Sequence, residues 1–325
     1  MSLPLTKIVF LDAATYGDIS LARFNSFWNC TIHQITKPAE TAQRLTGHAV
    51  AVTNKVEIDQ SILNSSEASD LKLIAVAATG TDIIDRKAAA RRGVIVCNVP
   101  GYATESVAQF TMSLILELTT RAGMYSDTVK RGEWEKSQVF ALLNYPSIEL
   151  KGKKLGIIGY GNIGRRVAEI AHGFGMEILV AARPGNSASV TSHRVPVNDL
   201  FRQVDVVSLH CPLTPETRNL INHSSLSLMK PTAFLINTAR GALIDETALI
   251  DALDKNQIGA AALDVITTEP PAPDHPIIRA AKTLDNLIVT PHIAWSTREA
   301  RERLLDEVKE NIAAFLRGER RNLVA

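Results

Sequence analysis

The stretch KLGIIGYGNIGRRVAEIAHGFG, residues 154–175, decides the fold class of this chain. It opens as an apolar strand, passes through three glycines spaced G-x-G-x-x-G, and continues with the apolar periodicity of a helix. In this setting Gly159, Gly161 and Gly164 predict a dinucleotide-binding turn. The first glycine permits the tight turn, the second lets a pyrophosphate approach the backbone, and the third allows close packing of helix on strand. The N-terminus of the helix offers N–H groups to the phosphates.

Short β-branched runs alternate with amphipathic stretches on both sides of this turn, a pattern typical of parallel sheets covered by helices. The first third of the chain offers four strands and the middle offers six. Because this is too many for one open sheet, the sequence predicts two doubly wound α/β units. The expected strands are 7–11, 49–52, 73–77, 94–98, 155–158, 178–181, 206–209, 233–237, 260–264 and 287–290.

Two longer stretches are predicted to be helices. Residues 104–121 are apolar around much of the helix circumference, so we expect burial on several sides, at a domain junction or a subunit interface. Residues 297–316 have one apolar face and come too late to extend the second sheet, so we expect this helix to return to the first unit. The proline-rich residues 267–276 predict a rigid loop.

Composition limits the classes of partner. With 46% hydrophobic residues, 21% charged residues and a net charge of +1 over 325 residues, the chain is typical of a globular protein. It shows no basic cluster for nucleic acid or membrane surfaces and no secretory leader or spanning segment. Cys30, Cys97 and Cys211 are widely spaced and odd in number, which indicates neither a disulfide framework nor a metal site. We expect a cytoplasmic protein.

Residues 177–187, EILVAARPGNS, lie where a nicotinamide-binding fold usually carries an acid for the adenosine ribose. Ala182 and Arg183 occupy that position, so the repulsion that excludes a 2′-phosphate is absent. The Arg183 guanidinium can pair with a 2′-phosphate, and Asn186 or Ser187 can add hydrogen bonds. The pattern favours NADP(H). The alternative is NAD(H), with Arg183 an ordinary solvated arginine.

Three further segments place polar residues directly after predicted strands, where open α/β sheets bind their ligands. Each residue alone has an ordinary structural explanation, as a buried histidine, a salt-bridge arginine or a solvated glutamate. Together, at three strand ends that follow a dinucleotide turn, they predict one cleft. The segments are FLINTARGALID (234–245) with Thr238 and Arg240, AALDVITTEPP (261–271) with Asp264 and Glu269, and NLIVTPHIAWS (286–296) with His292.

The order of these motifs resembles that of the D-isomer-specific 2-hydroxyacid dehydrogenases. The resemblance covers nearly the whole chain and rests on GYGNIG, LHCPLTPETRNLI, NTARGALID, LDVITTEPP and VTPHIAWST. Within the family, VTNKVEID, LIAVAATGTDIID, NVPGYATESVA and LNYPSIELKGKKLGIIGYG look most like bacterial glycerate dehydrogenases, also called hydroxypyruvate reductases. The resemblance implies a Rossmann-type NAD(P)-binding domain at 100–294, inserted into a flavodoxin-like substrate domain at 1–99 and 295–325.

The resemblance also implies roles for the polar residues. His292 would be the general acid that protonates the substrate carbonyl oxygen, and Glu269 would orient its imidazole and favour the protonated form. Arg240 would hold the 2-oxo acid and polarise its carbonyl. Backbone N–H groups around Thr79 and Gly80 would bind the substrate carboxylate.

Further residues would meet the cofactor. By the same resemblance, Asp264 would accept a hydrogen bond from the nicotinamide amide. The other implied cofactor-lining positions are Thr104, Asn162, Ile163, His210, Pro212, Thr217, Thr238 and Ala239.

The resemblance implies a homodimer, with the apolar helix 104–121 at a twofold interface. Gln109 in this helix stands where many relatives have Glu. The segment SQVFALLNY, residues 137–145, lies where relatives can contribute a residue to the neighbouring subunit's site. Core packing of Phe140 and Tyr145 is the favoured interpretation.

The sequence thus predicts a reductase of a small 2-oxo acid, hydroxypyruvate and also glyoxylate, that yields D-glycerate and glycolate. A D-lactate type of dehydrogenase differs only in the shape of the substrate pocket, so it stays open as an alternative. A nicotinamide-sensing protein similar to transcriptional corepressors of this fold is the alternative from another class.

Overall fold

The computed structural model describes residues 6–183 and 194–324. The chain forms two compact units, the first made of residues 1–103 and 296–325 and the second of residues 104–295. Each unit has its own parallel sheet, which confirms the predicted fold class of two doubly wound α/β units. The predicted changes of unit lie at 99/100 and 294/295, whereas the structure has them at 103/104 and 295/296.

The first unit is built on a five-stranded parallel sheet with the strand order β2-β1-β3-β4-β5. Its chain order reverses between β1 and β3, the place where sheets of this type bind ligands. Strand β2 was not predicted, because it is an edge strand of alternating exposure with no apolar run. The strands are β1 (Lys7–Phe10), β2 (Asn29–Ile32), β3 (Val50–Thr53), β4 (Leu73–Val76) and β5 (Ile95–Cys97).

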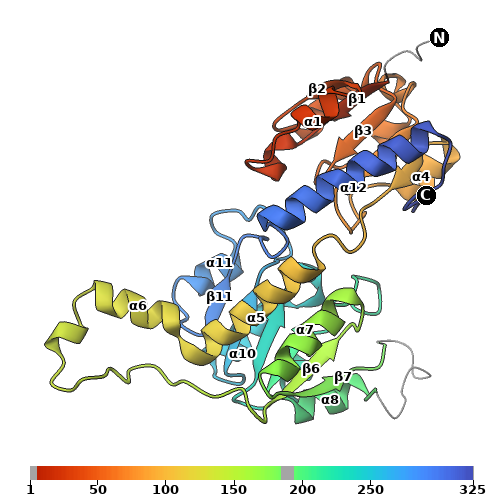
Figure 1. The fold of residues 1–325 in the computed structure, drawn as a ribbon. Coiled ribbons are helices and arrows are strands. Elements are labelled where there is room, and N and C mark those ends of the chain that lie inside the picture. The colour runs from red at the N-terminus through yellow and green to blue at the C-terminus, as the bar shows by residue number, and fades with distance from the viewer. Residues whose placement is uncertain (1–5, 184–193, 325) are drawn as a thin grey trace. The chain divides into compact units, whose positions relative to one another are not determined.

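One long helix from the end of the chain completes this unit. α12 buries Leu304, Leu305, Val308 and Ile312 and contacts β4, and Figure 1 shows it lying along the sheet. Its N-cap is Thr297, whose hydroxyl oxygen accepts the N–H of Ala300. The helices of the unit are α1 (Ala22–Asn25), α2 (Thr41–Leu45), α3 (Gln60–Leu63), α4 (Arg86–Arg91) and α12 (Arg298–Leu316).

The second unit has a six-stranded parallel sheet with the order β11-β10-β9-β8-β6-β7. The order reverses between β6 and β8, and β6 leads into the glycine-rich turn. All six strands were predicted to within one residue at either end. They are β6 (Lys154–Ile158), β7 (Glu177–Val180), β8 (Val206–Leu209), β9 (Phe234–Asn237), β10 (Ala260–Leu263) and β11 (Leu287–Val289).

Helices cover both faces of this sheet. On one face α5 and α7 share a core with alternate residues of the strands, and α8, α9, α10 and α11 form the core on the other. The apolar breadth of α5 is explained inside the unit, because Met112, Leu114, Ile115 and Leu118 are buried there. These helices are α5 (Thr104–Thr120), α7 (Asn162–Gly173), α8 (Val197–Gln203), α9 (His223–Leu226), α10 (Glu246–Asp254) and α11 (Pro276–Ala281).

An arm, residues 122–149, extends away from this sheet and returns to it (Figure 1). It contains α6 (Ala122–Lys130) and a long stretch without strands. Core packing is wrong for Phe140, which is 92% exposed beside Leu143 at 88%. Tyr145 does pack, edge to face on Tyr125 with ring centroids 4.9 Å apart. The arm therefore presents an apolar surface that the unit itself does not cover.

Across the described ranges, no helix has both the length and the apolar character that a membrane crossing requires.

Candidate active site

Three neighbouring strands of the second sheet carry the predicted catalytic residues to one edge. Arg240 follows β9, Glu269 follows β10 and His292 follows β11. Because these strands are adjacent and parallel, their carboxyl ends lie at the same edge of the sheet. The glycine-rich turn after β6 and the segment after β8 lie at this edge as well.

His292 and Glu269 are in direct contact. Nδ1 of His292 lies 2.5 Å from Oε2 of Glu269, and the other carboxylate oxygen accepts the backbone N–H of Ile266 at 3.0 Å. Both side chains keep some exposure, 25% for His292 and 31% for Glu269. The carboxylate thus fixes the imidazole while a ligand can still reach it. With Nδ1 on Glu269, Nε2 is the ring nitrogen placed to exchange a proton with a ligand.

Asp264 anchors the loop that presents His292. Its carboxylate accepts hydrogen bonds from the Thr290 hydroxyl at 2.6 Å and from the N–H groups of Ile293 and Ala294 at 2.9 and 2.8 Å. Its backbone oxygen accepts the N–H of His292 at 2.8 Å. Burial raises the pKa of Asp264, and these hydrogen bonds oppose that rise. Together they hold His292 at φ +56°, a left-handed conformation that costs free energy in a residue with a Cβ.

Asn237 plays the same part for Arg240. Its side-chain N–H donates to the backbone oxygen of Arg240 at 2.9 Å, and its Oδ1 accepts the N–H of Ala239 at 3.0 Å. Nη1 of Arg240 donates to the backbone oxygen of Ala239 at 2.8 Å. Sequence reasoning missed these anchoring roles of Asn237 and Asp264. One sequence signal could have found them: Asn237 is the polar last residue of an otherwise apolar strand, and Asp264 directly follows one.

The glycine-rich turn divides into packing glycines and an open one. A Cβ on Gly159, at φ +99°, would collide with the backbone of His210 and Cys211, and one on Gly164 would collide with the Gly159 carbonyl oxygen. A Cβ on Gly161 would meet no atom within 4 Å. The packing of the protein therefore explains the first and third glycines but not Gly161. A dinucleotide that approaches the N-terminus of α7 does explain it, so the turn fits such a cofactor.

The segment after β8 reaches the edge next to this turn. Nε2 of His210 lies 2.8 Å from the Ser208 hydroxyl, and burial lowers the pKa of His210 to about 4. The ring is therefore neutral at pH 7. The Thr217 hydroxyl donates to the backbone oxygen of Pro212 at 2.8 Å and accepts the N–H of Thr214 at 2.7 Å. Thr217 is buried, so it shapes this segment from within.

The other predicted cofactor positions lie at the ends of elements. Thr104 opens α5, and Asn162 and Ile163 open α7. Thr238, just after β9, has its hydroxyl 3.0 Å from that of Thr111 on α5. Ala239 is the next residue along. Arg183 is exposed three residues beyond β7, and the two residues expected to assist it, Asn186 and Ser187, lie outside the described residues.

In the first unit, Thr79 and Gly80 follow β4 at the carboxyl edge of that sheet. The Thr79 hydroxyl donates to the backbone oxygen of Val99 at 2.9 Å, and the Asn98 side chain donates to the Thr79 backbone oxygen at 2.7 Å. These bonds hold the loop on the segment after β5. Buried Asp12, after β1, was not singled out from the sequence.

The Asp12 carboxylate accepts the backbone N–H groups of Asn54 at 3.0 Å and Lys55 at 2.6 Å. It thereby fixes the segment after β3 at the point where this sheet reverses its order.

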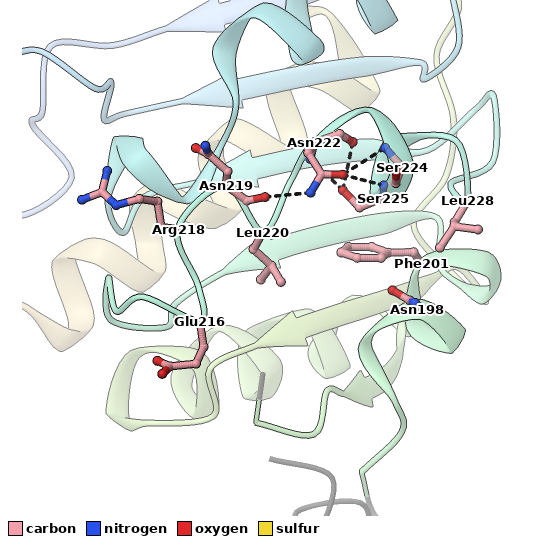
Figure 2. Close-up of a pocket in the computed structure, with 10 residues that line it drawn as sticks. All are labelled: Asn198, Phe201, Glu216, Arg218, Asn219, Leu220, Asn222, Ser224, Ser225 and Leu228. Atoms are coloured by element: carbon pink, nitrogen blue, oxygen red, sulfur yellow. Dashed lines mark hydrogen bonds between the residues drawn. The ribbon is translucent and has the colours of Figure 1, made fainter. Parts of the chain in front are cut away.

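Figure 2 shows a separate pocket in the second unit, between α8 and the segment that leads into α9. The polar groups that line this pocket belong to the N-cap of α9. The Asn222 side-chain oxygen accepts the N–H groups of Ser224 and Ser225, and the Asn222 side-chain amide donates to the Asn219 backbone oxygen. None of the predicted catalytic residues lines it. We assign these polar groups to the start of α9, not to the reaction.

Comparison with known proteins adds the family. Residues 112–294 match the family model for the NAD-binding domain of D-isomer-specific 2-hydroxyacid dehydrogenases. A glycerate dehydrogenase from Methylorubrum extorquens is 40% identical over 319 residues, which is 98% of each chain. The chain belongs to the D-isomer-specific 2-hydroxyacid dehydrogenase family. This D-2-hydroxyacid dehydrogenase is thus an oxidoreductase with a nicotinamide-binding domain, and the resemblance inferred from its motifs is confirmed.

Two further relatives extend the comparison of this dehydrogenase. A hydroxypyruvate reductase from Blautia hydrogenotrophica is 35% identical and covers 98% of this chain and 99% of its own. Among solved structures, an acyclic imino acid reductase in complex with NADPH and D-Arg superposes with a TM-score of 0.84 at 29% identity. That match covers 98% of this dehydrogenase and 100% of the other chain.

Proposed function

We propose that this dehydrogenase reduces hydroxypyruvate, and also glyoxylate, to D-glycerate and glycolate. The observation that carries the proposal is the His292–Glu269 contact at the sheet edge that also holds Arg240 and the glycine-rich turn. The relatives named glycerate dehydrogenase and hydroxypyruvate reductase, similar over nearly the whole chain, favour these substrates among 2-oxo acids.

In the proposed reaction each residue has one task. Arg240 binds the substrate carboxylate and carbonyl oxygen, which positions the acid and draws electron density from the carbonyl carbon. When bound, the reduced nicotinamide supplies a hydride to that carbon. His292, held by Glu269, releases a proton to the carbonyl oxygen, so that the C=O bond becomes CH–OH. The N–H groups around Thr79 and Gly80 bind the carboxylate.

For the cofactor we propose NADP(H), with NAD(H) as the alternative. Arg183 follows β7 where an acid would hold the ribose of NAD, and a guanidinium there can pair with a 2′-phosphate. We assign Asn162 and Ile163 to the pyrophosphate, His210 and Pro212 to the adenosine side, and Thr104, Thr238, Ala239 and Asp264 to the nicotinamide side. Thr217, which is buried, would support the adenosine side by holding the segment of Pro212 in place.

We also propose a homodimer formed through the arm. Phe140 and Leu143 are large, apolar and almost fully exposed. By contrast α5, the helix that the sequence suggested for the interface, buries much of its apolar surface within its own unit. The Trp134 indole N–H donates to the Phe140 backbone oxygen at 3.0 Å, so the arm carries a defined surface. A second copy is the proposed partner because an isologous interface needs only this one surface.

Initial rates of hydroxypyruvate reduction with NADPH and NADH, for the wild type and for Arg183→Ala, test the function. We expect turnover that favours NADPH, and a loss of about tenfold or more in kcat/KM for NADPH alone in the variant, because a charge-assisted pair to the 2′-phosphate is removed. An unchanged cofactor ratio would make Arg183 a bystander. Faster turnover of pyruvate would favour the D-lactate type, and cofactor binding without turnover of any 2-oxo acid would favour a nicotinamide sensor.

A further inference from the structure

One side chain outside the proposed catalytic set holds the loop of Glu269 at two places. Glu246 is the first residue of α10, six positions after Arg240. Its Oε1 accepts the backbone N–H of Thr267 at 2.7 Å, and its Oε2 lies 3.7 Å from Nε2 of His275. Thr267 and His275 stand at opposite ends of the proline-rich loop that contains Glu269. The side chains of Glu246 and His275 are both only 11% exposed.

These contacts continue directly into the His292–Glu269 pair. Thr267 follows Ile266, whose backbone N–H donates to Glu269 Oε1, and the other oxygen of Glu269 meets His292. A chain of single contacts therefore leads from Glu246 to the imidazole. Its links are two hydrogen bonds from backbone N–H groups to carboxylate oxygens, the peptide bond between Ile266 and Thr267, and the contact of Glu269 with His292.

The segment after Arg240 is pressed against the same place. A Cβ on Gly241 would collide with the backbone atoms of Ile266 and Thr267, so the two main chains are in contact there. This contact and the Glu246–Thr267 hydrogen bond join the loop of Arg240 to the loop of Glu269. Neither loop can shift without disturbing the other.

Helix capping does not explain Glu246. The N-cap of α10 is Asp245, whose side chain accepts the N–H of Ala248 at 3.1 Å. The Glu246 carboxylate instead reaches across to another loop and to a histidine, at low exposure. Removal of one member of such a pair leaves the other buried without its partner, which is costly.

We propose that Glu246 and His275 are a positioning pair that sets the Glu269 carboxylate against His292 and keeps this pair in register with Arg240. The inference rests on the proposed function, since it assigns Glu269 and His292 to that reaction. Neither Glu246 nor His275 touches substrate in this assignment. Their effect is on geometry, where a displacement of about 1 Å can cost about 100-fold in rate.

The test compares Glu246→Ala, Glu246→Gln and His275→Gln with the wild type. The measurements are kcat and KM for hydroxypyruvate across pH 5–9 (a range on the order of that in which His titrates), the dissociation constant of NADPH and the melting temperature. We expect kcat to fall about 10- to 100-fold in Glu246→Ala, with unchanged NADPH affinity. The pH profile of kcat/KM should also change, because Glu269, which contacts the proposed proton donor His292, is displaced. Asp264 and Arg240, two charged groups at the same edge, are unchanged in these variants, as is His210.

The conservative variants and a matched control separate positioning from folding. Glu246→Gln keeps an oxygen for the Thr267 N–H, so most of kcat should return, and His275→Gln should have a smaller effect than Glu246→Ala. The control is Asp205→Ala. Asp205 accepts the Lys154 N–H at 2.8 Å and pairs with Lys230 at 2.8 Å, the same kinds of contact, at the opposite edge of the sheet. It should lower the melting temperature and leave kcat and the pH profile unchanged.

The results that would refute the positioning pair differ from those that would refute the proposed function. If the wild type turns over hydroxypyruvate and Glu246→Ala keeps its kcat and pH profile, the positioning pair is refuted while the function stands. If the wild type turns over no 2-oxo acid, the function fails. The pair is then tested by NMR titration of the His292 ring, assigned with His292→Ala, and an identical titration in Glu246→Ala refutes it. If Glu246→Ala does not fold, His275→Gln carries the comparison, and a His275→Gln variant with the wild-type kcat and pH profile refutes the pair.

Discussion

At the scale of single residues, the site depends on a histidine held in an unfavourable backbone conformation. His292 keeps φ +56° because the Asp264 carboxylate binds the N–H groups on its far side and the Asp264 backbone oxygen binds its own N–H. Glu269 then fixes the ring. The backbone strain is local, and the hydrogen bonds that the buried Asp264 carboxylate accepts offset it.

His292→Ala tests the proposed proton donor. Loss of a positioned general acid is expected to lower kcat for hydroxypyruvate reduction by about 10²- to 10⁴-fold. The NADPH dissociation constant, measured by fluorescence titration, should change by less than about twofold, since we assign this side chain no cofactor contact. Near-normal turnover in the variant would remove His292 from the reaction.

His210 makes stability depend on pH. Burial lowers its pKa from 6.5 in the unfolded chain to about 4 in the native protein. Between these two pKa values the unfolded state binds more protons than the native state. The contribution of neutral His210 to the free energy of unfolding is therefore complete above about pH 6.5 and is lost as the pH falls toward 4. Because one proton is involved, the free energy of unfolding changes by at most about 1.4 kcal/mol per pH unit from this group.

Urea unfolding of the wild type and of His210→Gln at several pH values between about 4 and 7 measures this contribution. The variant keeps a polar partner for Ser208 but cannot gain the proton. Its free energy of unfolding should therefore fall less steeply with acid than that of the wild type. Parallel curves would show that His210 titrates alike in both states.

At the scale of elements, the glycine-rich turn combines two demands on the same six residues. Gly159 and Gly164 are required by the contact of β6, α7 and the end of β8, whereas Gly161 faces open space. Packing and ligand binding are thus assigned to different glycines. The spacing G-x-G-x-x-G alone does not distinguish them.

Gly161→Ala and Gly164→Ala separate the two demands. Gly161→Ala should change the free energy of unfolding without cofactor by less than about 0.5 kcal/mol, as for an open surface position, and weaken NADPH binding. Gly164→Ala should destabilise the protein by about 1–3 kcal/mol through the collision with Gly159. Chemical denaturation and cofactor titration of both variants measure this. Equal stability losses would contradict the division.

At the scale of the whole molecule, the arm exposes large apolar side chains, Phe140 and Leu143 among them, that its own unit does not cover. The proposed dimer predicts that Phe140→Ser with Leu143→Ser shifts the protein from dimer to monomer in light scattering coupled to size exclusion. The control is Ile35→Ser, an apolar side chain 70% exposed in the first unit, which should leave the assembly unchanged. A monomeric wild type, or a double variant that remains dimeric, would overturn the arm interface.

The sequence by itself determined the architecture. Apolar runs with turn signals predicted ten of the eleven strands, because buried parallel strands need continuous hydrophobic residues. Strand β2 escaped because an edge strand has no such need. The motif order determined the family and named Arg240, Glu269 and His292, since each follows a strand that the pattern already located.

Only the tertiary structure decided how those residues are held and where apolar surface is exposed. Asp264, Asn237 and Glu246 act on loops brought near by the sheet, and such contacts leave no periodic signal in the chain. Burial contradicted one expectation, since Phe140 is exposed on the arm, and it showed that α5 buries much of its apolar surface in its own unit. Hydrophobicity is a property of a residue, whereas burial and hydrogen-bond partners depend on which other segments surround it.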